Sequence, residues 1–197
     1  MGVVIDFDLS TVLFLGLVWV GAIIFLKFKK RKDFTYLLFF TVFYVYMAKL
    51  IDVTQFPMYF SESMRINIGQ NVWGNMNLMP FFTITEKSTI TSALNILITI
   101  PFGFGMPFIS GLRARGVVIA GCATSLLLEF FQFIIALMAG FTFRVVDIND
   151  VIFNTFGVII GYMIFVGFVR ICRFAVNKFG ICQNDILKYV LGRPQIK

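Results

Sequence analysis

One apolar stretch of the chain carries three polar side chains at the spacing of a single helix face. They stand in the segment Ser125-Leu-Leu-Leu-Glu129-Phe-Phe-Gln132, and positions i, i+4 and i+7 lie on the same side of an α-helix. A carboxylate inside a membrane-spanning helix costs at least a few kcal/mol and marks a functional site by default. Glu129 is therefore the first candidate for ligand binding or acid–base chemistry. A structural polar clamp between helices is the alternative.

A second polar stripe follows in the segment Arg144-Val-Val-Asp147-Ile-Asn149-Asp150-Val-Ile-Phe-Asn154. The positions 147, 150, 154, 157 and 161 are three or four residues apart, which describes one face of a helix, polar at its start and lined by glycine further on. Asp147 and Asp150 also suit the positive end of a helix dipole, so helix capping is an alternative role for one of them.

The glycines of this stripe predict how the polar groups meet. Gly157-x-x-x-Gly161 permits close contact between helices in a membrane, and we expect it to bring the fifth apolar run against the fourth. That approach would gather the polar side chains in one pocket, where Arg144 could pair with a carboxylate or hold an anion. The predicted ligand-binding residues are Asn77, Asn95, Glu129, Gln132, Arg144, Asp147, Asp150 and Asn154. For Asn77 the alternative is turn formation, and for Asn95 it is hydrogen bonding between helices.

The composition excludes several kinds of chemistry. The chain has no histidine, so imidazole bases, imidazole metal ligands and Ser-His or Cys-His pairs are ruled out. The three cysteines form no C-x-x-C pair, so neither a thiolate zinc site nor a disulfide framework is predicted. We expect no metal site and no cofactor. Carboxylates with amide help could nevertheless bind Mg²⁺ or Ca²⁺, which stays an alternative.

The elements that must position these residues are membrane spans. Of the 197 residues, 59% are hydrophobic and only 14% are charged, whereas soluble domains are about a quarter charged. The sequence predicts an all-α integral membrane protein with about five transmembrane helices of roughly 20 residues each. The third span contains Pro101, Gly103, Gly105 and Pro107, and we expect it to be kinked or broken. The predicted spans are residues 9–28, 34–51, 93–109, 117–138 and 151–169.

The remaining segments divide the chain into three parts. Residues 1–70 form a helical hairpin and the start of a long loop, in which a short interfacial helix is expected; residues 71–170 form the membrane core; residues 171–197 form a basic tail. With five spans, thirteen of the seventeen Lys and Arg residues fall on one side. The positive-inside rule makes that side the cytoplasm, which puts the N-terminus outside and the C-terminus inside. The basic tail suits anionic lipid headgroups better than nucleic acid.

An ordered set of motifs between residues 75 and 165 resembles the VanZ-like family of bacterial membrane proteins. The set comprises Asn77-Leu-Met-Pro80-Phe81, Asn95 with Ile100-Pro101-Phe102-Gly103-Phe104, Glu129-x-x-Gln132, Arg144-x-x-Asp147-Ile-Asn149-Asp150, and Asn154-Thr155-x-Gly157-x-x-x-Gly161. One departure is Asn149-Asp150, where family members more often show an aspartate followed by Asp-x-x-x-Asn. The first two spans vary in the family, so the resemblance says little about residues 1–70.

The resemblance implies a multi-pass protein of the bacterial plasma membrane that is associated with resistance to glycopeptide antibiotics, to teicoplanin more than to vancomycin. Teicoplanin carries a lipid tail that vancomycin lacks. We therefore expect an outer-leaflet pocket that binds a membrane lipid, a lipid-linked envelope precursor or the lipoglycopeptide itself, and no nucleic acid. The alternative is a membrane enzyme acting on an envelope lipid, with Glu129 or Asp150 as the catalytic acid or base. A transporter is the least favoured class, because no internal repeat is visible. The sequence predicts no oligomeric state.

Overall fold

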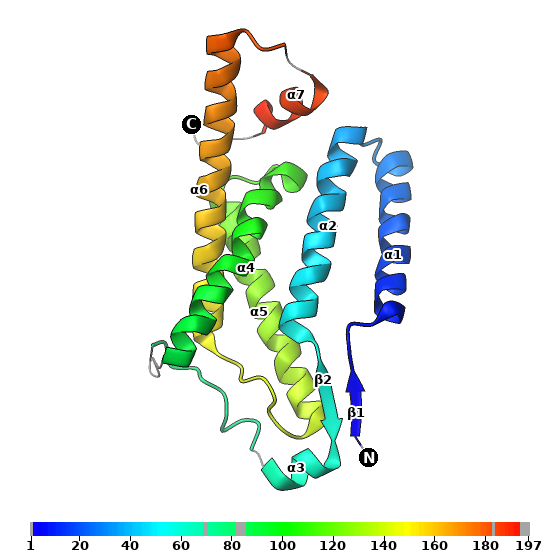
Figure 1. Cartoon of the computed structure of the whole chain (residues 1–197), viewed down its shortest axis with the longest axis vertical. Coiled ribbons are helices and arrows are strands. Elements are labelled where there is room, and N and C mark those ends of the chain that lie inside the picture. The colour runs from blue at the N-terminus through cyan, green and yellow to red at the C-terminus, as the bar shows by residue number, and fades with distance from the viewer. Residues whose placement is uncertain (1, 69–70, 82–85, 183, 194–197) are drawn as a thin grey trace.

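The structure is a computed structural model that describes residues 2–68, 71–81, 86–182 and 184–193. Figure 1 shows an elongated bundle of long helices with the N-terminus near one end and the C-terminus toward the other. The long helices are α1 (Leu9–Ile24, continued by the π-helical turn η1, Phe25–Lys29), α2 (Phe34–Gln55), α4 (Glu86–Ser110), α5 (Ala114–Ala139) and α6 (Ile148–Phe179).

All five long helices are long and apolar enough to cross a membrane. The predicted all-α fold with five spans is therefore confirmed. The five apolar runs each fall within one of these helices, although α4 begins before its predicted start at residue 93 and α6 extends well beyond residue 169. The residues up to Phe179 that we assigned to the tail thus continue the last helix.

Helix α4 passes through both of its prolines without interruption. Neighbouring helices can stabilise the backbone carbonyls that a proline frees in a membrane. The expected break in the third span is absent from this helix, and the expected kink stays a prediction.

The long loop after α2 contains two short elements. Strand β2 (Met58–Ser61) is followed at once by helix α3 (Glu62–Ile68), the short helix that the loop was expected to hold. Strand β1 (Gly2–Ile5) pairs with β2 in antiparallel register, with Gly2 opposite Ser61 and Ile5 opposite Met58. The sequence analysis did not predict these strands. They join the N-terminal segment to the loop at the end of the bundle that we call the N-terminal end (Figure 1).

Close packing between α4 and α6 rests on glycines of both helices. A Cβ atom on Gly157 would lie closer than 3.0 Å to the carbonyl oxygen of Ile96, and one on Gly161 equally close to that of Ile100. In the opposite direction, a Cβ on Gly103 would meet the carbonyl oxygen of Val158. Only glycine permits such an approach of two backbones.

We predicted that Gly157 and Gly161 allow the fourth span to pack closely on the fifth. That prediction is wrong, because these glycines face α4, the third span. Helix α5 approaches α6 through a glycine of its own: a Cβ on Gly121 would lie 2.6 Å from a methyl group of Val158. Val158 fills the space over Gly121, so the contact between α5 and α6 needs no small residue on α6.

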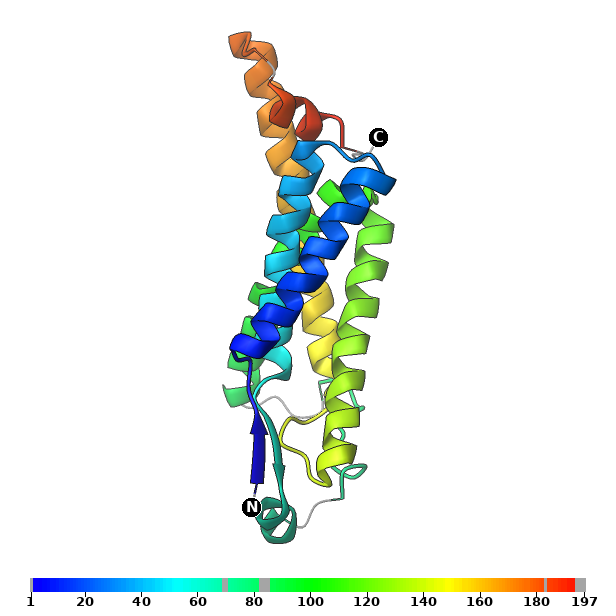
Figure 2. The ribbon, with the colours of Figure 1, turned by 90° about the vertical axis from the view of Figure 1, so that its right-hand side faces the viewer.

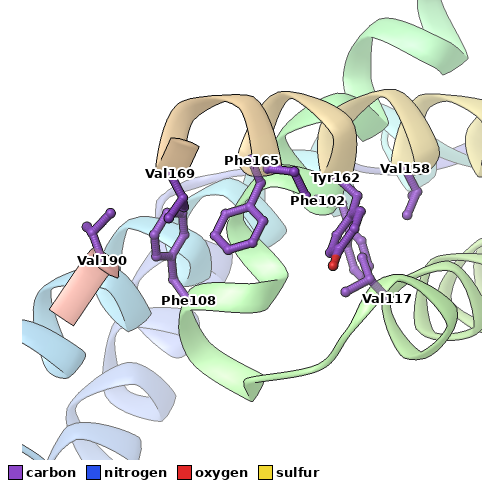
Figure 3. Packing of buried hydrophobic residues seen from close by; sticks show 9 residues of the cluster. Phe102, Phe108, Val117, Val158, Tyr162, Phe165, Val169 and Val190 are labelled. Atoms are coloured by element: carbon purple, nitrogen blue, oxygen red, sulfur yellow. The ribbon is translucent and has the colours of Figure 1, made fainter. Parts of the chain in front are cut away.

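Aromatic and branched side chains fill the interior between these helices, as Figure 3 shows. Phe108 packs edge-to-face on Phe165 with ring centroids 5.0 Å apart, and both side chains are almost fully buried. Helix α1 contributes no buried residue and runs obliquely along the outside of the bundle (Figure 2). Among the five long helices, α2, α4, α5 and α6 therefore build the core.

A short helix, α7 (Asp185–Leu191), closes the opposite end of the bundle. Its Tyr189 stacks on Phe39 with ring centroids 5.2 Å apart and donates its hydroxyl hydrogen to the carbonyl oxygen of Phe108. Val190 joins the core cluster. The tail is thus docked on the bundle by one aromatic and one aliphatic side chain.

Docking of α7 is expected to weaken between about pH 10 and pH 12. Burial raises the pKa of Tyr189 to about 12, although the neighbouring Arg193 lowers it. Because the pKa of Tyr189 is higher in the docked state, its contribution to the docking of α7 is complete at pH values below the pKa of a free tyrosine, about 10. That contribution is lost as the pH rises through the docked pKa. Limited proteolysis of the tail across this range measures the effect, and Tyr189→Phe should remove the pH dependence. Equal pH dependence in Tyr189→Phe would contradict the assignment.

Candidate functional site

The polar residues gather around the first turn of α6, at the N-terminal end of the bundle. Asp147 is the N-cap of this helix: its Oδ1 accepts a hydrogen bond from the backbone N–H of Asn149 at 2.8 Å. The same oxygen accepts a second hydrogen bond from the side-chain amide of Asn77 at 2.9 Å. Capping is thus one role of Asp147, and fastening a distant segment of the chain is another.

The segment fastened in this way is a strap over the start of α6, which we define as residues 77–81. Asn77 donates its N–H to Val146 O and accepts the N–H of Ile148, both at 2.9 Å, which makes a parallel bridge. At the other end of the strap, the N–H of Phe81 donates to Asn149 Oδ1 at 2.8 Å. Phe81 has φ of 61°, a left-handed conformation that a bulky residue rarely adopts. Side chains of α6 therefore hold the strap in place.

Glu129 reaches this cluster from α5. Its Oε2 accepts the backbone N–H of Asp147 at 3.0 Å, and only 6% of the residue is exposed. Glu129 thus joins α5 to the start of α6 at the point where the strap is fastened.

Three further polar contacts join α4, α5 and α6 below the strap. The amide of Asn95 donates to Asp150 Oδ1 at 2.7 Å, and the amide of Asn154 donates to Ser125 Oγ at 2.8 Å. Thr99, one turn after Asn95, donates to the backbone carbonyl of Asn154 at 2.8 Å. Because Asn154 is only 6% exposed, these bonds stabilise the bundle interior. Six of the predicted residues thereby meet in one network, which we call the carboxylate network: Asn77, Asn95, Glu129, Asp147, Asp150 and Asn154.

Gln132 and Arg144 lie apart from this network and bind the end of α2. The amide of Gln132 donates to the carbonyl of Thr54 at 3.1 Å, and the guanidinium of Arg144 donates to the carbonyl of Phe56 at 2.7 Å. In the opposite direction, the side-chain amide of Gln55 in α2 donates to the backbone carbonyl of Leu128 in α5 at 3.3 Å. These side chains line a cavity of about 20 Å³, which is large enough for about one water molecule.

The expectation that Arg144 pairs with a carboxylate is not met among the described residues, where the one ion pair joins Lys49 and Asp52. The physical reason is that Phe56 ends α2 and presents a free carbonyl within reach of the guanidinium. Anion binding by Arg144 stays a prediction.

Three polar residues of the site were not singled out from the sequence as site residues: Gln55, Thr99 and Asn149. Thr99 follows Asn95 by four residues, so the shared helix face was a usable signal. Asn149 stands between the two aspartates, where its role on the strap could not be inferred from spacing. Gln55 lies just beyond the second apolar run, and no pattern links it to Leu128.

In the described part of the chain, no group of three or more Asp, Glu, Cys or His side chains is arranged to hold a metal ion. The network is instead an array of carboxylate acceptors and amide donors. Such an array can recognise hydroxyl and amide groups by hydrogen bonding, and its carboxylates can accept or release a proton.

Comparison with known proteins identifies a family. The model of the VanZ/LLP1 family matches residues 12–172, which is well over half of the chain. Searches of curated proteins and of solved structures found no match.

Proposed function

We propose a function from the premise that this chain belongs to the VanZ/LLP1 family. It is a multi-pass membrane protein, and its carboxylate network binds a lipid-like or lipid-linked envelope molecule at the outer leaflet of the bacterial plasma membrane. This binding lowers susceptibility to lipoglycopeptides such as teicoplanin. No cofactor is needed for it.

The observation that carries the proposal is the position of the carboxylate network. It lies at the N-terminal end of the bundle, away from the basic segment at residues 27–32, Arg113 and Arg115, and the basic C-terminal region. Under the positive-inside rule the basic end is cytoplasmic. The N-terminus and the network then face the outer leaflet, where envelope lipids and lipoglycopeptides are found.

The chemistry of the network supports a headgroup with hydroxyl or amide groups. The hydrogen bonds described above use Oε2 of Glu129, Oδ1 of Asp147 and Oδ1 of Asp150. The second oxygen of each carboxylate is the acceptor that we assign to the ligand. Acyl chains of the same ligand would lie along the apolar helix surfaces beside it.

The test is antibiotic susceptibility in a sensitive Gram-positive host that expresses the chain. We expect protection against teicoplanin that exceeds protection against vancomycin, because only teicoplanin carries a lipid tail. Empty vector provides the baseline, and membrane levels of the protein are measured in each strain. Equal protection against both antibiotics, or none against teicoplanin, would contradict the proposal.

One observation favours an enzyme as the second candidate. Glu129 is buried and held at 3.0 Å by a backbone donor, as a positioned general acid or base would be. In that case the protein modifies an envelope lipid, with Glu129 or Asp150 as the catalytic carboxylate.

Glu129→Gln separates the two candidates. The amide oxygen of glutamine can still accept the N–H of Asp147, so the network is kept while the carboxyl group is lost. A binder should keep part of its protection, since a weakened hydrogen bond costs about 1 kcal/mol, or about fivefold in affinity. Loss of a catalytic acid or base costs about 100-fold or more. Teicoplanin susceptibility measures the difference, and Asp150→Asn is expected to behave in the same way.

The matched control is Glu62→Gln, the same chemical change at an exposed position of α3. It is expected to leave teicoplanin susceptibility unchanged. Complete loss of protection in Glu129→Gln at normal membrane levels would overturn the binder in favour of the enzyme.

A further inference from the structure

The loop before α4 reaches down the sides of two spanning helices. The ring of Trp73 contacts Phe133 of α5 with centroids 4.9 Å apart, and the ring of Phe81 contacts Phe153 of α6 with centroids 6.3 Å apart. Phe133 is more than one turn inside the end of α5 at Ala139, and Phe153 is more than one turn inside the start of α6 at Ile148. Residues 71–81 therefore lie beside the helices and not beyond their ends.

A count along α5 places this contact relative to the membrane. From Arg115, at the basic boundary, to Phe133 the helix rises about 27 Å at 1.5 Å per residue, which is inside a hydrocarbon core of about 30 Å. A tilted helix would bring Phe133 deeper still. Trp73 is thus at the depth of the acyl chains in the leaflet at the N-terminal end.

The backbone of the strap is hydrogen-bonded to the protein at both of its ends. Irregular backbone at membrane depth is stable only where its polar groups are bonded within the protein. Asn77 exchanges two backbone hydrogen bonds with the residues on either side of Asp147, and the N–H of Phe81 is bonded to Asn149. These bonds join the strap to the start of α6.

Four apolar side chains of residues 71–81 are exposed, as are Asn71 and Asn75. Trp73, Leu78 and Met79 are 66%, 64% and 64% exposed, and Phe81 is 52% exposed. At the depth deduced above, the surroundings of these side chains are lipid. We infer that residues 71–81 lie in the leaflet at the N-terminal end, with Trp73, Leu78, Met79 and Phe81 against lipid acyl chains.

This placement gives the carboxylate network a lateral approach from the bilayer. Resting on the proposed function, it means that the ligand reaches the network past the strap, as an acylated molecule already dissolved in the leaflet. The placement itself can be measured without antibiotic or ligand, so its failure and that of the proposed function are distinguishable.

The first experiment measures the depth of Trp73. The chain has two tryptophans, so Trp19→Phe leaves Trp73 as the sole fluorophore in full-length protein reconstituted into phosphatidylcholine vesicles. Lipids brominated near the carbonyl end of the acyl chain are expected to quench most of its emission, and lipids brominated near the terminal methyl less. Acrylamide in the aqueous phase should quench little. Strong quenching by acrylamide together with none by either bromolipid would overturn the inference.

The reference variant is Trp73→Phe, which leaves Trp19 near the middle of the first span. Its emission should show the reverse order, with stronger quenching by the deeper bromine. This reference establishes that the vesicles contain inserted, folded protein and calibrates the depth scale.

A second measurement keeps both tryptophans. Cys122, Cys172 and Cys182 are replaced by serine, Met79→Cys is labelled with a nitroxide, and spin relaxation by oxygen is compared with relaxation by a water-soluble nickel chelate. Oxygen partitions into the bilayer, so it should dominate at position 79. At the control position Ile66→Cys on α3, 70% exposed and far down the N-terminal end (Figure 1), the nickel chelate should dominate. Equal nickel accessibility at both positions would overturn the inference.

Discussion

Gly161→Ala is expected to destabilise the folded chain by about 3 kcal/mol, because the added methyl group overpacks a full interface. The Cβ would lie closer than 3.0 Å to the carbonyl oxygen of Ile100, and the obstacle is backbone and not a side chain that can rotate away. Helices α4 and α6 would have to separate along the line that also carries Asn95 and Asp150. The change therefore affects the carboxylate network as well as stability.

Gly167→Ala is the matched control, since it makes the same change on the same helix. No atom lies within 4 Å of a Cβ built at this position. Its stability should stay within about 0.5 kcal/mol of the parent chain, as for surface substitutions in general. Unfolding of the purified proteins in mixed micelles, followed by circular dichroism against the mole fraction of sodium dodecyl sulfate, measures both. Equal stability of the two variants would show that α4 and α6 are further apart than the structure has them.

Asp147→Ala is expected to have the largest effect among single changes in the carboxylate network. It removes the N-cap of α6, which is worth about 0.5–2 kcal/mol, and the charged acceptor of the Asn77 amide, worth about 1.5–3 kcal/mol. Since the two terms share one oxygen, about 2–4 kcal/mol is expected for the loss together. Release of the strap at Asn77 should accompany it.

Asp147→Asn separates capping from charge. Asparagine is as good an N-cap as aspartate, and its side-chain oxygen can still accept from Asn77, so this variant should keep most of the stability. Asp8→Ala is the control for capping alone, because Asp8 caps α1 and its side chain, within the described residues, bonds to Ser10 and Thr11 of that helix. Hydrogen exchange of residues 71–81 should rise in Asp147→Ala and stay unchanged in Asp8→Ala. Unchanged exchange in Asp147→Ala would contradict the role of Asp147 as the fastening point of the strap.

The spanning helices could be predicted from the sequence because hydrophobicity and length determine them locally. Five apolar runs and five spanning helices coincide. The strands could not be predicted in this way, because Gly2–Ile5 and Met58–Ser61 pair across more than fifty residues. The partner of Gly157 and Gly161 was also missed. A small-residue motif indicates that some helix approaches closely, but the shapes of all the candidate surfaces decide which helix it is.

For the candidate site, the helical spacing of polar residues brought Glu129, Asp147, Asp150 and Asn154 together correctly. Gln132 and Arg144 have hydrogen-bond partners that the spacing did not predict, for one reason. Both side chains bind backbone carbonyls at the end of α2, and a free carbonyl has no signature in the amino-acid sequence. Opposite charge predicts ion pairs, whereas helix ends offer acceptors that any donor can use.

The order of the helices along the chain has a consequence for synthesis. The N–H that binds Glu129 comes 18 residues later, and the carboxylate that binds Asn95 comes 55 residues later. At about 5–20 residues per second, Glu129 exists for roughly one to four seconds before Asp147 has been added to the chain. During that interval the nascent protein carries a carboxylate in an apolar helix without its partner. A chain that stops before residue 147 never leaves this state, so a truncated product lacks the N–H that binds Glu129 in the finished protein.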